Sequence, residues 1–334
     1  MKIVGFDLSF KPKRKVNIVI KDHVIRYLEL KNNGKEIVVK DCKERYLPDG
    51  VIKEGKIQNR EKLTFILAEC VEEWKIKNRE VQFIVPDQII VIRRVQVPGD
   101  LLEDEIQSHL FLELGASIHL PFEEPLFEFK LLPNSEQKNK QDILLIAAPE
   151  ETVEQYRQLL EDVSLDAVVA DISSLSIYRL YYSAMEDVEN EHLLLIQYDL
   201  SSVNLTIFNE EFPVFSRHIV NEFDEGSWEV SDGKIAWTKN EEDLQAVIEE
   251  DIVEMDRVMN FYRFTLTKGK EEITKILIIG DNPYLSDVIG KMKDRFTVPI
   301  MSFDEGVFQT DTGEALPREQ YLALGLALKE VQTK

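Results

Sequence analysis

The feature that most constrains the fold is a repeated order of predicted elements in the two halves of the 334-residue chain. β-Branched and aromatic runs predict strands, and apolar residues at helical spacing predict helices. The first half is predicted to hold four strands, a long helix and a fifth strand, at 2–8, 15–21, 24–30, 36–41, 59–77 and 81–85. The second half is predicted to hold three strands, a long helix, a fourth strand and a second helix, at 192–198, 203–208, 213–220, 241–263, 275–280 and 285–293. Both halves therefore contain the order of three strands, a helix and a strand. Such a duplication is typical of two related α/β domains that face a cleft.

An inserted unit separates the two halves, predicted over 81–165. Its elements are predicted as strand, helix, strand, polar loop, strand and helix, at 88–97, 101–114, 126–132, 133–141, 142–148 and 150–163. The domain boundaries follow from this order. We expect the first α/β domain at 1–80, completed by about 166–190 and 317–334, and the second at 191–316.

Composition excludes several classes of function. The net charge is 40 minus 62, or −22, which disfavours nucleic acid and anionic lipid and favours a basic partner, such as a lysine-rich cytoplasmic tail of a membrane protein. The two cysteines, Cys42 and Cys70, form neither a disulfide framework nor a zinc motif, which indicates a reducing cytosol. The five histidines show no metal-ligand spacing, and no apolar run approaches the roughly 20 residues that span a bilayer. The composition therefore predicts a soluble intracellular protein.

Local motifs along nearly the whole chain resemble the PilM-type proteins of type IV pilus assembly, members of the actin-like superfamily related to FtsA. The motifs are LPDGVIKEGKIQN (47–59), VPDQIIVIRRVQVPGDLLEDEI (85–106), HLPFEEPLFEF (119–129), FPVFSRHI (212–219), VIEEDIVEMDRVMNFYRF (247–264), ILIIGDNPYLSDVIGKMKDRFTVPI (276–300) and YLALGLALK (321–329). The resemblance implies an α/β fold of duplicated actin-like (RNase H-like) domains around a cleft, with an inserted small α/β subdomain.

In actin-like ATPases two glycine-containing hairpins hold the nucleotide phosphates, because backbone amides must approach the anion closely. The resemblance places the first hairpin at Asp7-Leu8-Ser9-Phe10 and the second at Asp199-Leu200-Ser201-Ser202. Both aspartates are present and both glycines are absent. The second turn is also short, since strand character resumes by Val203.

We interpret these positions as a vestigial nucleotide site. It comprises Asp7, Ser9, Lys11, Asp199, Ser201, Ser202, Gly280 and Asp281, where the last two replace the Gly-Gly of the family's adenosine turn. Lys11, Lys13, Arg14 and Lys15 form a basic turn with three alternative roles: binding phosphate, forming a solvated turn around Pro12, or contacting an acidic surface of the chain. No catalytic residue, metal ligand or cofactor is expected, with Mg-ATP as the alternative.

The resemblance implies a cytoplasmic scaffold of a type IV pilus or related assembly complex. Such a scaffold binds the cytoplasmic tail of a PilN-like bitopic membrane protein, and so lies at the inner face of the membrane through that partner. We expect the groove near the strand and helix spanning 85–114, where Ile89, Val91 and Ile106 are either contacts or core. The alternatives are an active actin-like ATPase and an FtsA-like division protein. The second is disfavoured because the sequence stops at LALKEVQTK without a membrane-binding helix.

Overall fold

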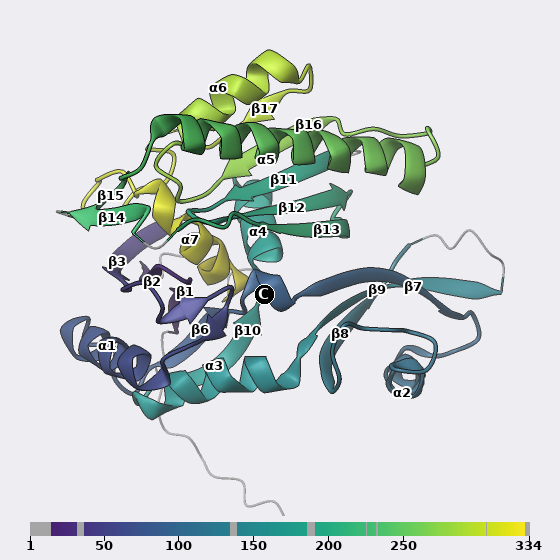
Figure 1. The fold of residues 1–334 in the computed structure, drawn as a ribbon. Coiled ribbons are helices and arrows are strands. Elements are labelled where there is room, and N and C mark those ends of the chain that lie inside the picture. Colours follow the sequence, from purple (N-terminus) through teal and green to yellow (C-terminus); the bar gives the residue numbers. More distant parts are fainter. Residues whose placement is uncertain are drawn as a thin grey trace, which may run out of the picture.

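Two five-stranded sheets of the same topology form the frame of the molecule (Figure 1). The computed structural model describes residues 15–31, 37–133, 139–185, 191–224, 226–231, 233–304 and 306–330. The first sheet has the order β10-β6-β1-β2-β3, with bounds β1 Val16–Ile20, β2 Val24–Lys31, β3 Val38–Tyr46, β6 Glu80–Ile84 and β10 Asp166–Asp171. The second has the order β13-β12-β11-β16-β17, with bounds β11 His192–Tyr198, β12 Ser202–Asn209, β13 Phe212–Val220, β16 Lys275–Ile279 and β17 Ile300–Met301.

The two sheets are topological copies of each other. In each one, three consecutive strands pair antiparallel, and the first of them pairs parallel with a later strand: β1 with β6, and β11 with β16. A further parallel strand extends each sheet, β10 next to β6 and β17 next to β16. The predicted duplication is therefore confirmed in the described residues. The strand predicted at 2–8 lies outside them.

Helices cover the outer face of each sheet and also fill the space between the sheets. The first lobe is the first sheet with α1 (Arg60–Glu73) and α3 (Glu150–Asp162), which share one apolar core. The second lobe is the second sheet with α5 (Glu241–Phe261) and α6 (Leu285–Arg295). Between the sheets lie α4 (Ser173–Ala184) and α7 (Tyr321–Ala327), whose core contains side chains of both sheets (Figure 1). Because both faces of each sheet are covered, the central strands are buried along their whole length, as in Val16–Ile20, where Asn17 is the one polar residue.

Helices α4 and α7 cross at a distance that only glycine permits. A Cβ atom on Gly325 of α7 would lie 2.2 Å from the backbone oxygen of Ser176 in α4. Real Cβ contacts do not reach this distance, so a larger residue at 325 would push the two helices apart. The layer between the lobes therefore depends on this glycine.

The inserted unit is smaller than the predicted 81–165. It is a three-stranded sheet of order β7-β9-β8, formed by β7 (Val91–Pro98), β8 (Pro125–Leu131) and β9 (Lys140–Pro149) and covered on one face by α2 (Glu103–Glu113). Strand β6 pairs inside the first sheet and α3 packs into the first core, so both belong to the first lobe. Burial explains the difference: α3 presents Val153, Tyr156 and Leu160 to the first lobe's core.

Several short elements escaped the sequence patterns. The stretch 221–240, for which no element was predicted, contains the hairpin of β14 (Trp228–Ser231) and β15 (Lys234–Trp237). A second small hairpin joins β4 (Ile52–Lys53) to β5 (Lys56–Ile57). The strand predicted from 88 begins instead as a 3-10 turn, Asp87–Ile89. Single helical turns occur at Arg318–Gln320 and Leu328–Glu330, and α5 continues as a π-helical turn, Tyr262–Leu266. Among the helices described, none combines the length and apolar character needed to cross a membrane.

Candidate functional site

Two tight hairpins meet in the cleft between the lobes. The turn between β1 and β2 is closed by Lys21 and Val24, whose backbone groups bond to each other at 2.9 and 3.4 Å. The turn between β11 and β12 is closed by Asp199, whose backbone N–H donates to the oxygen of Ser202 at 2.9 Å. Each turn has only two residues at its tip, Asp22-His23 and Leu200-Ser201. The amide that begins each turn is therefore used within the hairpin and does not point into the cleft.

The first hairpin lies at a different place from the one predicted. Because Val16–Ile20 is the strand that pairs parallel with β6, it corresponds to β11, and the residue after it corresponds to Asp199. That residue is Lys21, not Asp7. The predicted residues Asp7, Ser9 and Lys11 lie outside the described part of the chain.

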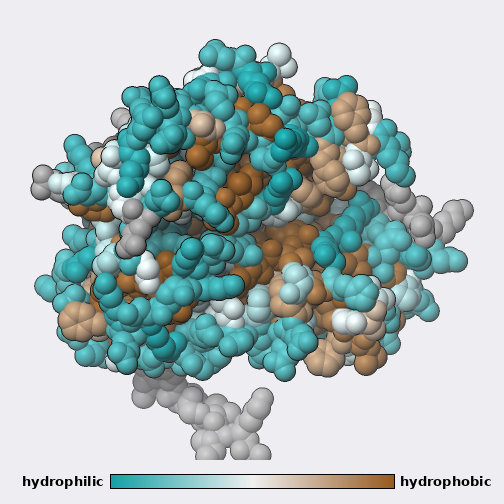
Figure 2. Space-filling view, in the orientation of Figure 1, coloured by the Kyte–Doolittle hydropathy of each residue, from teal (hydrophilic) through white to brown (hydrophobic). Residues whose placement is uncertain are grey.

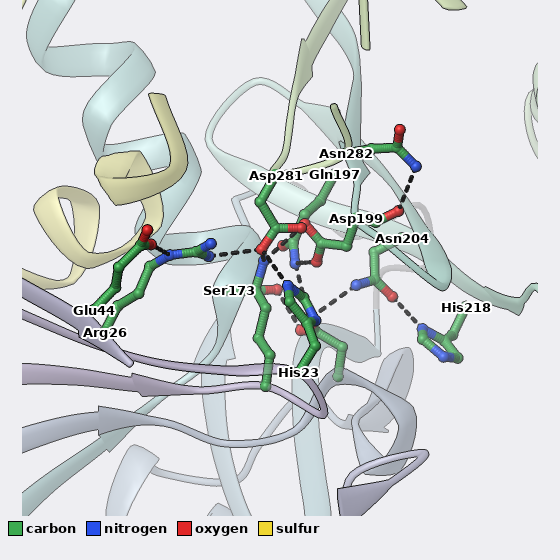
Figure 3. Close-up of polar contacts among 12 residues, drawn as sticks. His23, Arg26, Glu44, Ser173, Gln197, Asp199, Asn204, His218, Asp281 and Asn282 are labelled. Carbon is green, nitrogen blue, oxygen red and sulfur yellow. Dashed lines mark hydrogen bonds and ion pairs between the residues drawn. The ribbon is translucent and has the colours of Figure 1, made fainter. Parts of the chain in front are cut away.

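Lys21 and Asp199 form an ion pair across the cleft. The Lys21 Nζ atom lies 2.7 Å from Asp199 Oδ1 and 3.1 Å from Asp281 Oδ2. Asp281 also accepts from Arg26 Nη1 at 2.6 Å and lies 3.1 Å from His23 Nε2 (Figure 3). We call these five residues the interlobe network, because three come from the first lobe and two from the second. They join side chains as far apart in sequence as Lys21 and Asp281, 260 residues.

Burial and charge set the protonation of the interlobe network. Burial alone would raise the pKa of Asp281, but Lys21, His23 and Arg26 outweigh it and hold that pKa well below its usual range. Burial alone would lower the pKa of Lys21, but Asp199 and Asp281 outweigh it and raise that pKa. Burial raises the pKa of Asp199, and Lys21 opposes the rise. Each charge therefore depends on the opposite charge beside it.

A second polar cluster continues from the interlobe network around Asp87, which lies three residues after the end of β6. Asp87 Oδ2 accepts from Asn204 Nδ2 at 2.8 Å and from Gln197 Nε2 at 3.3 Å, and Asp87 Oδ1 accepts from the hydroxyl of Ser173 (Figure 3). Gln197 also donates to Asp199, which links the two clusters. Burial raises the pKa of Asp87 to about 6, although the hydrogen bond from Ser173 opposes this shift. The first and second lobes are thus joined by hydrogen bonds as well as by ion pairs.

His218 of β13 completes the second cluster. Its Nδ1 bonds with Asn204 Oδ1, and burial lowers the pKa of His218 to about 4. The ring is therefore neutral near pH 7 and donates from Nδ1. In this arrangement His218 orients Asn204 so that its amide donates to Asp87.

The adenosine turn of the resemblance, Gly280 and Asp281, lies against the second hairpin. Gly280 has φ +152°, and a Cβ atom there would lie 1.8 Å from the backbone oxygen of Tyr198. Asn282, which follows Asp281, donates from Nδ2 to the backbone oxygen of Asp199 at 3.2 Å. The two segments are in direct contact, so glycine is retained at 280 for packing.

Aromatic side chains pack around the same turn. The rings of Trp228 and Tyr284 have centroids 6.1 Å apart, and Trp237 lies 5.1 Å from Trp228. Phe223 contacts both tryptophans, at 5.8 and 5.2 Å. The β14–β15 hairpin therefore attaches to the second lobe beside the Gly280 turn through these rings.

Little free volume remains between the hairpins. The cavity lined by Lys21, His23, Asp87, Asp199 and Ser201 has about 40 Å³. A water molecule needs roughly 10–15 Å³ by this measure, so the space suits a few waters. Ser202 also lines this cavity, but its backbone belongs to β12 and pairs with Val220.

Five of the eight residues predicted for this site lie in the described part of the chain, and their role as a vestigial nucleotide site stays a prediction. Asp199, Ser201, Ser202, Gly280 and Asp281 do meet in the cleft. The short second turn is confirmed, since β12 resumes at Ser202. Sequence reasoning missed the first-lobe members and Asp87, although Lys21-Asp22-His23 between two apolar runs was a usable hairpin signal. No group of side chains in the described residues has the arrangement of a metal site.

Known proteins share this architecture. A sequence profile of the family described as type IV pilus assembly protein PilM matches residues 17–330. A solved PilM–PilN type IV pilus biogenesis complex is similar at 19% identity and a TM-score of 0.75, covering 96% of this chain and 100% of that one. The ethanolamine utilization protein EutJ from Carboxydothermus hydrogenoformans is similar at 10% identity and a TM-score of 0.53, covering 96% and 90%. The predicted fold class, actin-like domains around a cleft, is confirmed.

Proposed function

Because this chain belongs to the PilM family of type IV pilus assembly proteins, we propose that it is a cytoplasmic scaffold that binds the cytoplasmic tail of a PilN-like membrane protein. In this proposal the protein reaches the inner face of the membrane through its partner. The cleft between the lobes does not bind a nucleotide, and the scaffold acts as a pseudo-ATPase.

The observation that carries this proposal is the Lys21–Asp199 ion pair, 2.7 Å across the cleft. A triphosphate with Mg²⁺ requires backbone amides that point at the phosphates and carboxylates free to face the metal or the attacking water. Here a lysine stands where the first hairpin would supply a carboxylate, and it pairs with the carboxylate of the second. The turn tips contain no glycine, and the remaining cavity of about 40 Å³ is far below the roughly 300–1,000 Å³ of ligand pockets. The residues present do not fit Mg-ATP.

The inserted unit offers a surface for an extended tail. On the face of its sheet away from α2, apolar side chains recur at every second residue along β9, Leu144 and Ile146, with Ile92 opposite on β7 and Leu126 at the start of β8. Figure 2 shows apolar surface gathered between β13 and the inserted sheet. β8 is an edge strand in the described sheet, so a peptide laid beside it gains main-chain hydrogen bonds and side-chain contacts.

Of the three residues predicted around this groove, Ile106 is a core residue, and Ile89 and Val91 are partly buried. Ile106 is fully buried against the inserted sheet and is a core residue. Ile89 packs against the first lobe's core and is partly buried. Leu126 is 49% exposed, which makes it the better candidate for a tail contact. The net charge of −22 would steer a lysine-containing tail toward the protein.

Thermal shift measurements with two ligands test the proposal. The peptide is the cytoplasmic segment of a bitopic membrane protein encoded beside this chain, and it is expected to raise the melting temperature, whereas Mg-ATP leaves it unchanged. Leu126→Ser is expected to weaken the peptide effect. Phe65→Ser, on α1 at 65% exposure, is the matched control and should not. Stabilisation by Mg-ATP would refute the pseudo-ATPase part, and no shift with the peptide would refute the scaffold part.

A further inference from the structure

The three most exposed large apolar side chains in the described part of the inserted unit lie on α2 or directly before it. Phe111 and Leu112 are 74% and 75% exposed, and Leu102, the residue before the helix, is 65% exposed. Figure 1 places α2 at the outer edge of the inserted unit, away from both lobes. Figure 2 shows apolar side chains among hydrophilic ones at this edge. We call Leu102, Phe111 and Leu112 the α2 surface.

Packing inside the protein does not account for the α2 surface. Ile106 and Leu110 are one helical turn apart, fully buried, and fix the face of α2 that contacts the sheet. At about 100° per residue, Phe111 and Leu112 turn progressively away from that face. They lie outside the unit's core of Val97, Ile106, Leu110, Ile143 and Leu145. Exposed side chains of this size in a cluster mark an interaction site more often than scattered ones do.

The segment of the chain that carries the α2 surface contains many acidic residues and no lysine or arginine. Residues 99–129 contain eight acidic residues and no lysine or arginine: Asp100, Glu103, Asp104, Glu105, Glu113, Glu123, Glu124 and Glu128. From β7, the side chain of Arg93 reaches this segment and donates to the backbone oxygen of His119 at 2.6 Å. Some of the acids have local roles, since Glu105 accepts from the Leu102 amide at 2.9 Å and Glu113 accepts from Ser117. Asp100, Glu103 and Asp104 are exposed on α2 or shortly before it, and α2 itself carries no lysine or arginine; we call these three residues the acidic border.

We propose that the α2 surface is the docking site for a basic amphipathic helix of another protein. Leucine, isoleucine or phenylalanine side chains of that helix pack against Phe111 and Leu112, and its lysines or arginines face the acidic border. A second copy of this chain is a poorer occupant, because two molecules of charge −22 repel each other. The site is separate from the tail groove, since α2 and the groove lie on opposite faces of the inserted sheet. The inference therefore stands without the tail-binding proposal.

Fluorescence anisotropy with the whole protein in 0.15 M salt tests this site. The probe is a labelled 14-residue helix of leucine and lysine at amphipathic spacing, and the control probe has glutamate at every lysine position. The lysine probe is expected to bind and the glutamate probe not to bind. Phe111→Ser with Leu112→Ser is expected to weaken binding of the lysine probe by about tenfold or more, as at other buried apolar contacts. Glu103→Gln with Asp104→Asn is expected to weaken it by roughly two- to tenfold, as for exposed charge pairs.

Two controls separate a real site from general attraction. Phe65→Ser removes an equally exposed aromatic side chain from α1, and should leave binding of the lysine probe unchanged. The Phe111→Ser, Leu112→Ser variant should keep the melting temperature of the unchanged protein, which shows that it is folded. Equal loss in both variants, or no loss in either, would overturn the proposal. Self-association of the free protein through Phe111 and Leu112 in analytical ultracentrifugation would also overturn it.

Discussion

Replacing Lys21 by methionine tests whether the ion pair across the cleft holds the two lobes together. Methionine keeps most of the length and apolar volume of the lysine side chain and removes its charge. The change leaves Asp199, whose side chain is 6% exposed, without its opposite charge. Removing one partner of a buried ion pair costs about 3–5 kcal/mol, because the remaining charge stays buried and unpaired. We expect the free energy of unfolding to fall by that amount near pH 7.

The surface offers a matched control. Lys77 pairs with Glu72 at 2.8 Å, but the two side chains are 54% and 67% exposed. An exposed pair of this kind contributes about 0–1 kcal/mol. Lys77→Met is therefore the same chemical change with a several-fold smaller expected effect.

The cost of Lys21→Met should depend on pH in a defined direction. Burial raises the pKa of Asp199 in the folded protein, and loss of Lys21 raises it further. An acid whose pKa is higher in the folded than in the unfolded state destabilises the fold above its unfolded pKa, and this effect grows until pH passes the folded pKa. The variant should lose more stability at pH 8 than at pH 5, relative to the unchanged protein. Adding Asp199→Asn removes the unpaired charge and should restore most of the loss.

Urea unfolding followed by tryptophan fluorescence is the assay. Trp74 reports on the first lobe, and Trp228 and Trp237 report on the second. A loss of stability with Lys21→Met no larger than with Lys77→Met would refute the reasoning. Failure of Asp199→Asn to restore stability would refute it as well.

The remaining predictions concern the glycine between the lobes and the pH response of Asp87. Gly325→Ala is expected to destabilise the fold by more than about 2 kcal/mol in urea unfolding, because its Cβ would meet the Ser176 backbone at 2.2 Å. Gly290→Ala, in α6 with nothing within 4 Å, should instead stabilise by about 0.5–1 kcal/mol, and the same sign at both positions would contradict the packing argument. Asp87 has a folded pKa of about 6, above the unfolded value, so stability should fall by up to about 3 kcal/mol as pH rises from about 4 to 6. Asp87→Asn should flatten that part of the stability–pH curve, and an unchanged slope would show that another acid, such as Asp251, is responsible.

Local patterns were sufficient to predict most elements and the duplication. The strands at 192–198, 203–208 and 213–220 and the helices at 59–77 and 150–163 were predicted to within a few residues. The helices are long and show a clear helical period, and the strands are short apolar or β-branched runs between turn residues, so both types can be recognised from local sequence. The β14–β15 hairpin was missed because its four-residue strands are too short to show a period.

The pairing of strands was not accessible from local patterns. The run 15–21 was predicted as a strand, but its place as the central partner of β6 depends on residues 81–83, far along the chain. For this reason the first hairpin was assigned to Asp7 and not to Lys21. The second hairpin was predicted correctly because its strands and its short turn are contiguous in sequence.

By itself the sequence determined that two similar α/β lobes and an inserted unit would form, since apolar periodicity and turn residues act over short stretches. It also determined that glycine is absent from the turn tips at 22–23 and 200–201. Only the tertiary structure decided that Lys21 lies opposite Asp199, and that Arg26 and Asp281 are neighbours. Those contacts arise where two separately folded sheets meet, and no local pattern of residues encodes which side chains face each other there.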